Sequence, residues 1–305
     1  MKIITEAPEL KGKRVLVRVD WNVIKDGKVA DSFRIKKSLP TIEFLLGAGA
    51  YVLLATHLEE GNVEVLKPFV PEGAELLPNL RENPGEEANS EEFAKELASK
   101  ADIFVNEAFS VSHRNHASIV SVPKLLPSYA GLRFVEEIKA LSKSFYPAHP
   151  FILILGGAKI ETKLPLVDKF SNIADEIFIG GAMAKTAAEM PLKDNPKISL
   201  PTGDLTALDA NAETIEILKP KILEAKFIIW NGPLGQYETG HSQYTHELAK
   251  ALADAPGEVV IGGGDTLAAI EELGLLDKFS FVSTGGGAML DFLATGTLPG
   301  IEALN

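Results

Sequence analysis

The sequence contains no cysteine among its 305 residues. This absence excludes disulfide bonds, thiolate metal sites and a cysteine nucleophile, and it suits a reducing compartment, so we expect the cytoplasm. Long apolar runs are missing as well. Residues 1–20 mix charged and apolar side chains, so we expect neither a signal peptide nor a membrane-spanning helix.

Positive charge is in short supply, because the formal net charge is −12 at pH 7. Duplex binding normally rests on clustered cations that face phosphates, so we expect no nucleic-acid partner. Arginine is missing from the second half, since all six arginines precede residue 134. Guanidinium groups bind carboxylate and phosphate in bidentate fashion, which favours an anion site in the first half. Chance and solvated surface remain an alternative explanation of the bias.

Length and composition indicate a globular protein of two domains, with 46% hydrophobic and 24% charged residues. Short β-branched runs alternate with amphipathic segments, a pattern typical of parallel strands buried on both faces. We expect strands at 14–19, 50–55, 102–105, 151–155, 176–179, 227–230, 258–261 and 279–283, and helices at 90–99, 163–173, 212–223 and 245–252. The predicted fold class is therefore α/β, with two doubly wound parallel-sheet lobes of Rossmann-like type.

A helix is predicted between the two lobes. Four hydrophobic residues have helical spacing, and prolines that end a helix follow them: Phe134, Ile138, Leu141, Phe145, Pro147 and Pro150. We place the domain junction there, with a first domain over 1–140 and a second over 141–294. The segment 59–77 has little periodicity and reads as a long connection rather than another strand and helix.

Glycine follows nearly every predicted strand of the second half. These loops hold Gly156 and Gly157, Gly180 and Gly181, Gly232 before Pro233, Gly262 to Gly264, and Gly285 to Gly287. In an open parallel sheet, ligands bind outside the carboxyl ends of the strands, where glycine lets the backbone approach closely. Five such loops predict a nucleotide-sized site, although each loop alone is more simply a tight turn.

The fingerprints of single phosphate-binding loops are absent. A Walker A loop ahead of Lys185 would need glycine at positions 179 and 184, which hold Ile179 and Ala184. A dinucleotide motif starting at residue 262 or 285 would need glycine at 267 or 290, and both are leucine. An NAD dehydrogenase and a P-loop NTPase are thus disfavoured. Lys159 and Lys163, spaced i and i+4, are predicted to share one face at a helix start and to hold phosphates with the loops.

Polar residues follow the strands of the first half instead of glycine. Asp20 and Asn22 follow the first strand, His57 the second and Asn106 the third; Arg34, Arg81 and Arg114 lie near them in the sequence. An arginine-rich cleft with Asn and His donors suits a small acid that bears a phosphate. Each residue alone is more simply a surface charge or a turn residue, so the hypothesis depends on their shared position at strand ends.

The sequence resembles the phosphoglycerate kinase family across most of its length. The resemblance rests on Arg-Val-Asp-Trp-Asn at 18–22, His-Arg-Asn-His-Ala-Ser at 113–118 and Trp-Asn-Gly-Pro at 230–233, and on segments 31–35, 56–58, 79–81, 84–89, 105–109, 154–159, 179–183, 262–266 and 283–288. It implies two α/β lobes joined by a hinge helix, with the tail 295–305 docking back on the first lobe.

The resemblance also implies an activity and a set of binding residues. The activity would be reversible phosphoryl transfer from 1,3-bisphosphoglycerate to ADP, giving 3-phosphoglycerate and ATP, with Mg²⁺ as the nucleotide's cation. Separately from the resemblance we expect a monomer, and apolar surface exposed by the shortening would instead favour a dimer. Residues implied to contact the phosphoglycerate are Asp20, Asn22, Arg34, His57, Arg81 and Arg114. Residues implied to bind the nucleotide are Gly157, Lys159, Lys163, Gly180, Gly181, Asn231, Pro233, Glu238, Gly262, Gly263, Gly264, Asp265 and Thr266, with Asp265 on the metal.

This reaction demands alignment and charge neutralisation more than proton transfer. The acceptor carboxylate, with a pKa near ~3.5, is already ionised at pH 7 and needs no general base. We therefore predict that Arg34 and Lys159 neutralise the transferring group while the loops at Gly263 and Gly286 offer backbone N–H donors. Because the two ligands would lie on separate lobes, closure about the hinge helix is expected.

The chain departs from the family pattern in two ways. Where the family usually reads His-Leu-Gly-Arg-Pro, this chain has His57-Leu-Glu-Glu-Gly61, so Glu60 replaces an arginine that faces the phosphoglycerate. The chain is also shorter than is usual for the family, with the missing material after Gly61 and after Thr186. Two alternatives follow: a catalytically weakened homologue that still binds the magnesium nucleotide, and a kinase for another small acid.

Overall fold

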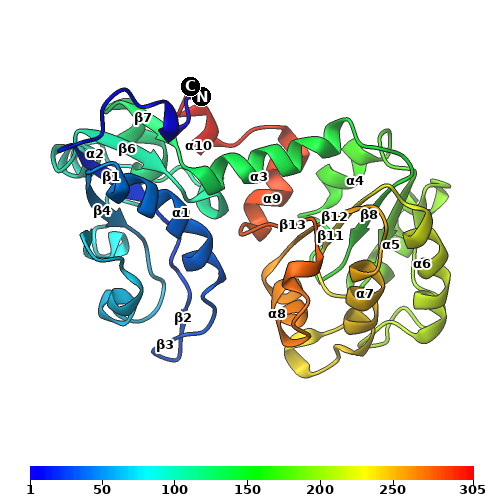
Figure 1. Cartoon of the computed structure of the whole chain (residues 1–305). Coiled ribbons are helices and arrows are strands. Elements are labelled where there is room, and N and C mark those ends of the chain that lie inside the picture. Colours follow the sequence, from blue (N-terminus) through cyan, green and yellow to red (C-terminus); the bar gives the residue numbers. More distant parts are fainter. The chain divides into compact units, whose positions relative to one another are not determined.

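The computed structural model describes residues 1–305, apart from the side chain of Lys193, and divides into two compact units. The first unit comprises Met1–Lys139 together with Thr295–Asn305, and the second comprises Ala140–Ala294. Each unit holds a parallel β-sheet with helices around it (Figure 1). In the part of the chain so described, no helix combines the length and apolarity that crossing a bilayer requires.

The first unit is built on a five-stranded parallel sheet in the order β5-β4-β1-β6-β7. Its strands are β1 (Arg14–Arg18), β4 (Tyr51–Ala55), β5 (Ala74–Leu76), β6 (Ile103–Asn106) and β7 (Ser128–Ala130). The central strand β1 is buried on both faces, as its run of Val15, Leu16 and Val17 predicts. A small antiparallel hairpin pairs β2 (Ile24–Lys25) with β3 (Lys28–Val29).

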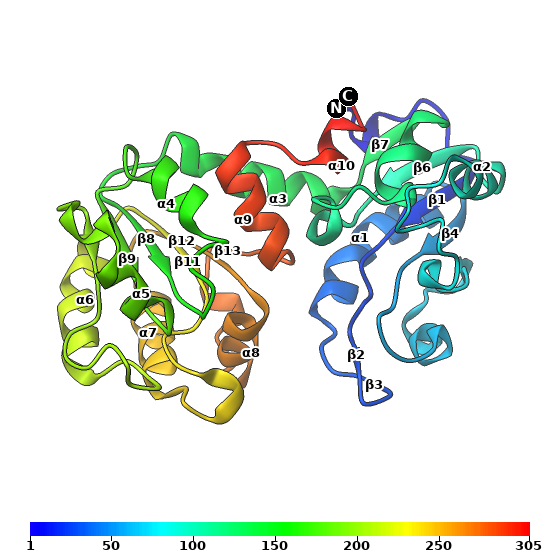
Figure 2. The ribbon, with the colours of Figure 1, turned by 180° about the vertical axis from the view of Figure 1, so that it is seen from behind.

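Helices and short turns connect these strands. The α-helices are α1 (Phe33–Gly47) and α2 (Glu91–Ser99), and the short helices are η1 (Ile4–Glu6), η2 (Val63–Phe69), η3 (Leu80–Glu82), η4 (Phe109–Val111), η5 (Ala117–Ser121) and η6 (Val122–Lys124). Both chain ends belong to this unit and lie side by side (Figure 2). At the C-terminal end, α10 (Pro299–Glu302) docks through a hydrogen bond of 2.8 Å from Gly300 N to Ser112 O.

The second unit is built on a six-stranded parallel sheet in the order β10-β9-β8-β11-β12-β13. Its strands are β8 (Phe151–Leu155), β9 (Glu176–Ile179), β10 (Ile198–Ser199), β11 (Phe227–Asn231), β12 (Glu258–Gly262) and β13 (Phe281–Val282). Its helices are α4 (Leu164–Phe170), α5 (Met183–Glu189), α6 (Ala212–Glu224), α7 (Gln243–Ala253), α8 (Gly264–Glu272) and α9 (Gly286–Thr295), with η7 (Lys143–Phe145), η8 (Pro191–Asp194), η9 (Tyr237–Thr239) and η10 (Leu276–Lys278).

Both sheets are doubly wound, which confirms the predicted fold class. In each sheet the chain begins at a central strand, adds two strands on one side and then returns to the other side. The strand order therefore reverses between β1 and β6 in the first unit and between β8 and β11 in the second. In such sheets the carboxyl ends of the strands at the reversal point border the ligand crevice.

Three edge strands escaped the sequence prediction. The segment 59–77, which reads as a connection, contains η2 and the edge strand β5, and β7 and β10 are edge strands as well. Each of these strands holds only two or three residues, so no apolar run marks it. The helix α1, which holds Pro40 in its interior, was not predicted either.

The helix α3 (Leu132–Ser142) carries the chain from the first unit to the second, and a buried carboxylate anchors its start. The Glu107 carboxylate accepts hydrogen bonds from the backbone N–H groups of Arg133 at 3.0 Å and Phe134 at 3.2 Å. It also accepts one from Thr41 Oγ1 on α1, at 2.6 Å. Burial raises the pKa of Glu107 to about 8, against the opposing effect of these donors. One carboxyl group thus ties β6, α1 and the start of α3 together.

We expect Glu107→Gln to lower the free energy of unfolding of the first unit by about 1–3 kcal/mol, because its amide N–H₂ would face backbone N–H donors. The pKa of Glu107 is higher in the folded state than its ordinary 4.5, so this carboxyl group stabilises the fold most below pH 4.5 and loses that effect as pH rises through about 8. The deficit of the variant should therefore shrink between pH 5 and pH 9. Urea unfolding followed by the fluorescence of Trp21, in a Trp230→Phe background, measures it.

The control is Glu136→Gln, on the exposed side of the same helix, where Glu136 pairs with Arg133 at 3.2 Å. Exposed ion pairs contribute little, so this change should stay within about 0.5 kcal/mol. Equal unfolding midpoints for the two variants would contradict the anchoring role of Glu107.

Candidate functional site

In the first unit, an ion-paired carboxylate lies just beyond the end of β1. Asp20 is buried and accepts hydrogen bonds from Arg34 Nη1 at 3.0 Å and from Ser110 Oγ. Burial alone would raise the pKa of Asp20, but Arg34, His57 and Ser110 together hold it below its ordinary value. Because Arg34 is the second residue of α1, this pair fixes its guanidinium next to the strand ends.

The buried guanidinium of Arg18 dominates the electrostatics of this cluster. It donates to Ser118 Oγ at 2.8 Å and to His57 Nδ1 at 3.2 Å, and Glu86 lies at 3.9 Å. Burial and the nearby positive charges of Arg18, Arg81 and Arg114 lower the pKa of His57 to about 3, although Asp20 opposes this shift. His57 is therefore neutral at pH 7.

Two buried N–H groups of this cluster have no hydrogen-bond partner within the described residues. Arg18 can only donate, so Nδ1 of neutral His57 must accept, which leaves the proton on Nε2. Nε2 of His57 and Nε of Arg81 are both buried and without a partner. Buried donors are nearly always satisfied, so this pair of groups indicates a site for an acceptor such as an anion.

Acidic side chains form ion pairs with Arg81 and Arg114, at the rim of this cluster. Arg81 pairs with Glu87 at 2.7 Å, and one oxygen of Glu59 lies 3.8 Å from both Arg81 and Arg114. The backbone N–H of Glu59 donates to Asn22 Oδ1 at 3.0 Å, which holds the loop after β4 in place. All six residues predicted to contact the phosphoglycerate therefore lie in or beside one cluster. Their roles in binding stay predictions.

The two glutamates of this loop have different partners. Glu60, which was expected to replace an arginine that faces the phosphoglycerate, accepts a hydrogen bond from Asp26 N at 2.8 Å. Glu59 is the residue that meets the arginines. The buried Arg18 was also missing from the predicted contacts, although its place at the end of an apolar strand is a signal for a buried, functional charge.

In the second unit, the glycine loops after β8, β9 and β11 pack against each other. Gly157 N donates to Pro233 O at 2.8 Å. A Cβ at Gly156 would overlap the carbonyl oxygens of Gly232 and Pro233, and one at Gly181 would lie 2.7 Å from Gly157. Only glycine permits this approach. The three loops therefore form one continuous backbone surface.

The loop after β12 and the start of α9 join the same surface. Gly232 N donates to Thr266 Oγ1 at 2.9 Å, which connects the β11 loop to α8. A Cβ at Gly263 would lie 3.5 Å from the side chain of Asn231, and one at Gly286 would lie 3.2 Å from Gly263. All five predicted glycine loops therefore lie together, including those that hold Gly180, Gly262 and Gly264.

The two predicted lysines do not share a helical face, which corrects the expectation from their spacing. Helix α4 begins only at Leu164, so Lys159 lies in an irregular loop and is exposed. Lys163 is buried and donates to the carbonyl oxygens of Gly156 and Asn231, the latter at 3.3 Å. Burial lowers the pKa of Lys163 to about 8, with Asp265 opposing. Lys163 therefore holds the loops after β8 and β11 together, whereas the side chain of Lys159 is exposed.

A pocket of about 220 Å³ opens beside these loops. Gly157, Pro233, Glu238 and Asp265 are among the residues that line it. Burial and the neighbouring Glu238 raise the pKa of Asp265, while Lys163 opposes the shift. Two carboxylates in one pocket suit a hard cation such as Mg²⁺, which prefers oxygen ligands. Across the described side chains, no group of three or more His, Asp or Glu could hold a metal, so a cation here would need ligand phosphates and water as well.

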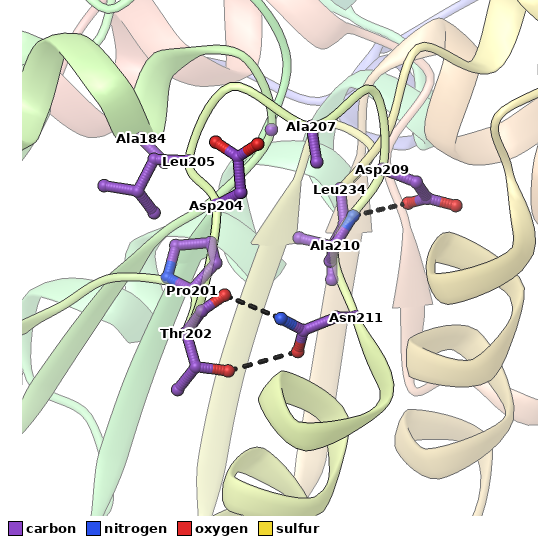
Figure 3. Close-up of a pocket in the computed structure, with 11 residues that line it drawn as sticks. Ala184, Pro201, Thr202, Asp204, Leu205, Ala207, Asp209, Ala210, Asn211 and Leu234 are labelled. Atoms are coloured by element: carbon purple, nitrogen blue, oxygen red, sulfur yellow. Dashed lines mark hydrogen bonds between the residues drawn. The ribbon is translucent and has the colours of Figure 1, made fainter.

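A second pocket, of about 200 Å³, is lined by Gly181 and Leu234 among other residues. Figure 3 shows Leu234 and the loop 201–211 around this pocket. The loop 201–211 forms its other wall. That loop is fixed by two hydrogen bonds between Thr202 and Asn211, at 2.7 and 3.1 Å. No glycine run marks this loop, so sequence reasoning missed it. It lies beside α5, the helix that follows the β9 loop.

Comparison with known proteins gives a consistent result. The family model described as phosphoglycerate kinase matches residues 4–72, 61–194 and 186–296. The chain is 37% identical to the phosphoglycerate kinase of Fervidobacterium nodosum, over 99% of this chain and 98% of the relative, and 36% identical to that of Roseiflexus castenholzii, over 96% of each. The first alignment runs over 392 positions, more than the 305 residues of this chain, so the relative holds internal segments that are missing here.

Solved structures agree with the sequence relatives. Phosphoglycerate kinase from Pyrococcus horikoshii matches with a TM-score of 0.87 at 27% identity, over 100% of this chain and 98% of the other. The enzyme from Coxiella burnetii matches with a TM-score of 0.84 at 29% identity, over 99% of this chain and 98% of the other. The three stretches of the family match meet at 61–72 and 186–194, next to Gly61 and Thr186, after which material was expected to be missing.

We expect Gly156→Ala to destabilise the second unit by about 1–3 kcal/mol, because the new Cβ would overlap backbone carbonyl groups that cannot move freely. Gly264→Ala is the matched control. A Cβ at Gly264, in the first turn of α8, meets no atom within 4 Å, so stability should stay equal or rise slightly. Urea unfolding followed by Trp230, in a Trp21→Phe background, compares them. Equal losses in both variants would contradict the close packing of the loops.

Proposed function

The chain belongs to the phosphoglycerate kinase family, and from this premise we propose how its residues divide the work. The reaction is reversible transfer of a phosphoryl group from 1,3-bisphosphoglycerate to ADP, which gives 3-phosphoglycerate and ATP. In our proposal the first domain, 1–140 with the tail 295–305, binds the phosphoglycerate. The second domain, 141–294, binds the nucleotide.

One observation carries the assignment of the first domain: the buried N–H groups of His57 and Arg81 that lack a partner. Phosphate and carboxylate oxygens would satisfy them, and Arg34 and Arg114 supply further charge at the rim. Asp20 orients Arg34 through their hydrogen bond of 3.0 Å, and Asn22 fixes the loop after His57. Neutral His57 can donate a hydrogen bond from Nε2 to an anion. Because its ring carries no charge at pH 7, it needs no counter-ion in the absence of that anion.

The assignment of the second domain rests on its glycine surface. Backbone N–H groups in the loops at Gly262, Gly263 and Gly264, and at Gly285, Gly286 and Gly287, would bind oxygens of the transferring phosphate, with Lys159 as the mobile cation. The pocket between Gly157 and Glu238 would hold part of the nucleotide. Gly180, Gly181, Asn231, Pro233 and Thr266 shape these loops, and buried Lys163 holds their carbonyl groups together.

Asp265 and Glu238, the two carboxylates of the pocket of about 220 Å³, fit a magnesium nucleotide. Asp265, whose pKa is raised beside Glu238, would gain from a nearby cation, and oxygen donors are what Mg²⁺ takes. When bound, the cation would neutralise charge on the nucleotide phosphates. The chain's own part is to place Asp265 at the start of α8, close to the phosphate-binding loops.

Arg34 and Lys159 would complete the reaction centre by neutralising the phosphoryl group as it moves. The acceptor carboxylate is ionised at pH 7, so no side chain needs to act as a base. The two domains must approach for transfer, and we propose that α3 acts as the hinge, with Glu107 as the fixed point at its start. We further propose a cytoplasmic monomer with no nucleic-acid partner.

A coupled assay of ATP formation from 1,3-bisphosphoglycerate and ADP tests the function. We expect turnover that depends on Mg²⁺ and that ceases when the cation is chelated. Binding of the magnesium nucleotide without turnover would support the weakened homologue instead. Turnover with another small acid, and none with 3-phosphoglycerate in the reverse direction, would identify a different kinase.

Lys159→Ala should reduce kcat by about 10²–10³-fold and change KM only a few-fold, because a cation that meets charge developed in transfer acts mainly on the transition state. Lys278→Ala is the control, since Lys278 is exposed in η10 and has no part in the proposed site. Steady-state kinetics in both directions compare the variants. Equal effects on kcat and KM would remove Lys159 from the reaction centre.

A further inference from the structure

The loop after β4 places a carboxylate where a substrate anion would bind. Glu59 Oε1 lies 3.8 Å from Arg81 Nη2 and 3.8 Å from Arg114 Nη1, so a single oxygen faces both guanidinium groups. The position is fixed from the backbone, because Glu59 N donates to Asn22 Oδ1 at 3.0 Å.

The other ion pairs around Arg81 and Arg114 show that Glu59 is the acidic residue that bridges them. Arg34 already has Asp20 as its partner, and buried Arg18 lies 3.9 Å from Glu86. Arg81 has Glu87 at 2.7 Å, but Glu87 is not paired with Arg114. Glu59 is the acidic side chain paired with Arg114 and the one that bridges both rim arginines. Burial lowers the pKa of His57 and of His116, and the positive charges of Arg18, Arg81 and Arg114 lower both further.

The contact is weak enough to be displaced. The Glu59 side chain is 58% exposed, and both distances are near the upper limit for an ion pair. Partly solvated pairs of this kind contribute little to stability. A phosphate that binds Arg81 and Arg114 would have to move this carboxylate aside and then lie near a like charge.

We propose that Glu59 is a built-in counter-ion of the phosphoglycerate site, which competes with the substrate's anionic group for Arg81 and Arg114 and so sets the substrate affinity. This inference rests on the proposed function of the first domain. Glu59 does not touch the phosphoryl group in transfer, so it should act on binding and leave the chemical step unchanged. It favours ligands whose charge is high enough to replace the carboxylate at both arginines.

Glu59→Gln tests the proposal, and Glu60→Gln is the matched control. Both changes remove one negative charge from the same loop, but Glu60 faces Asp26 N and not the arginines. Isothermal titration calorimetry with 3-phosphoglycerate, without nucleotide, measures binding directly. We expect Glu59→Gln to tighten Kd and lower KM for 3-phosphoglycerate by about three- to tenfold, which corresponds to about 0.7–1.4 kcal/mol. The value of kcat should stay within about twofold, and Glu60→Gln should match the wild-type protein.

The remaining outcomes separate this inference from the function on which it rests. Unchanged or weaker binding by Glu59→Gln would overturn the counter-ion role, as would an equal gain in Glu60→Gln, which would indicate only the net charge of the loop. Arg114→Ala serves as the test of the site itself. If it binds 3-phosphoglycerate as tightly as the wild-type protein does, the proposed phosphoglycerate site fails, whatever Glu59 does.

Discussion

Both units depend on one geometric constraint, the reversal of strand order beside the first strand of each sheet. Parallel strands buried on both faces need covering helices, and a chain that adds strands first on one side and then on the other places those helices on both faces. At the reversal point, the loops after β1 and β6, or after β8 and β11, diverge to opposite faces of their sheet. Some candidate site residues of each unit follow these strands, and others follow their neighbours β4, β9 and β12.

The same constraint serves different chemistry in the two units. In the first unit, charged side chains lie beyond the strand ends. In the second unit, loops whose backbones approach closely at glycine lie there instead. Each unit also buries one cation that donates to backbone carbonyl groups: Arg18 to Val19 O, and Lys163 to the carbonyls of Gly156 and Asn231. Burial lowers the pKa of both cations, which shows that their positions cost solvation. Such groups persist where they hold neighbouring loops in a required geometry.

The sequence predicted the features that depend on long, regular patterns. The strands β8 and β9 match their predicted bounds, because an apolar run on a doubly covered strand is distinctive, and the glycine loops mark strand ends directly. Short edge strands and α1 had no such pattern. Side-chain placement was harder still: the spacing of Lys159 and Lys163 indicates one helical face, but the helix begins after both. Lys163 donates to Gly156 O in the preceding loop and to Asn231 O, which is 68 residues away, and helical spacing encodes neither contact.

The stretches of the family match join at two places that lie outside the strands of both sheets. One junction, at 61–72, follows the loop that carries Glu59, and the other, at 186–194, begins within α5, the helix that borders the second pocket. Removing a strand from the centre of either sheet would expose both faces of its neighbours, whereas connections at the surface can shorten without uncovering the core. Both sheets keep the doubly wound strand order, and the whole chain matches solved structures of the family with TM-scores of 0.84 and 0.87. Within the first unit, the loop after β4 places the Glu59 carboxylate beside Arg81 and Arg114.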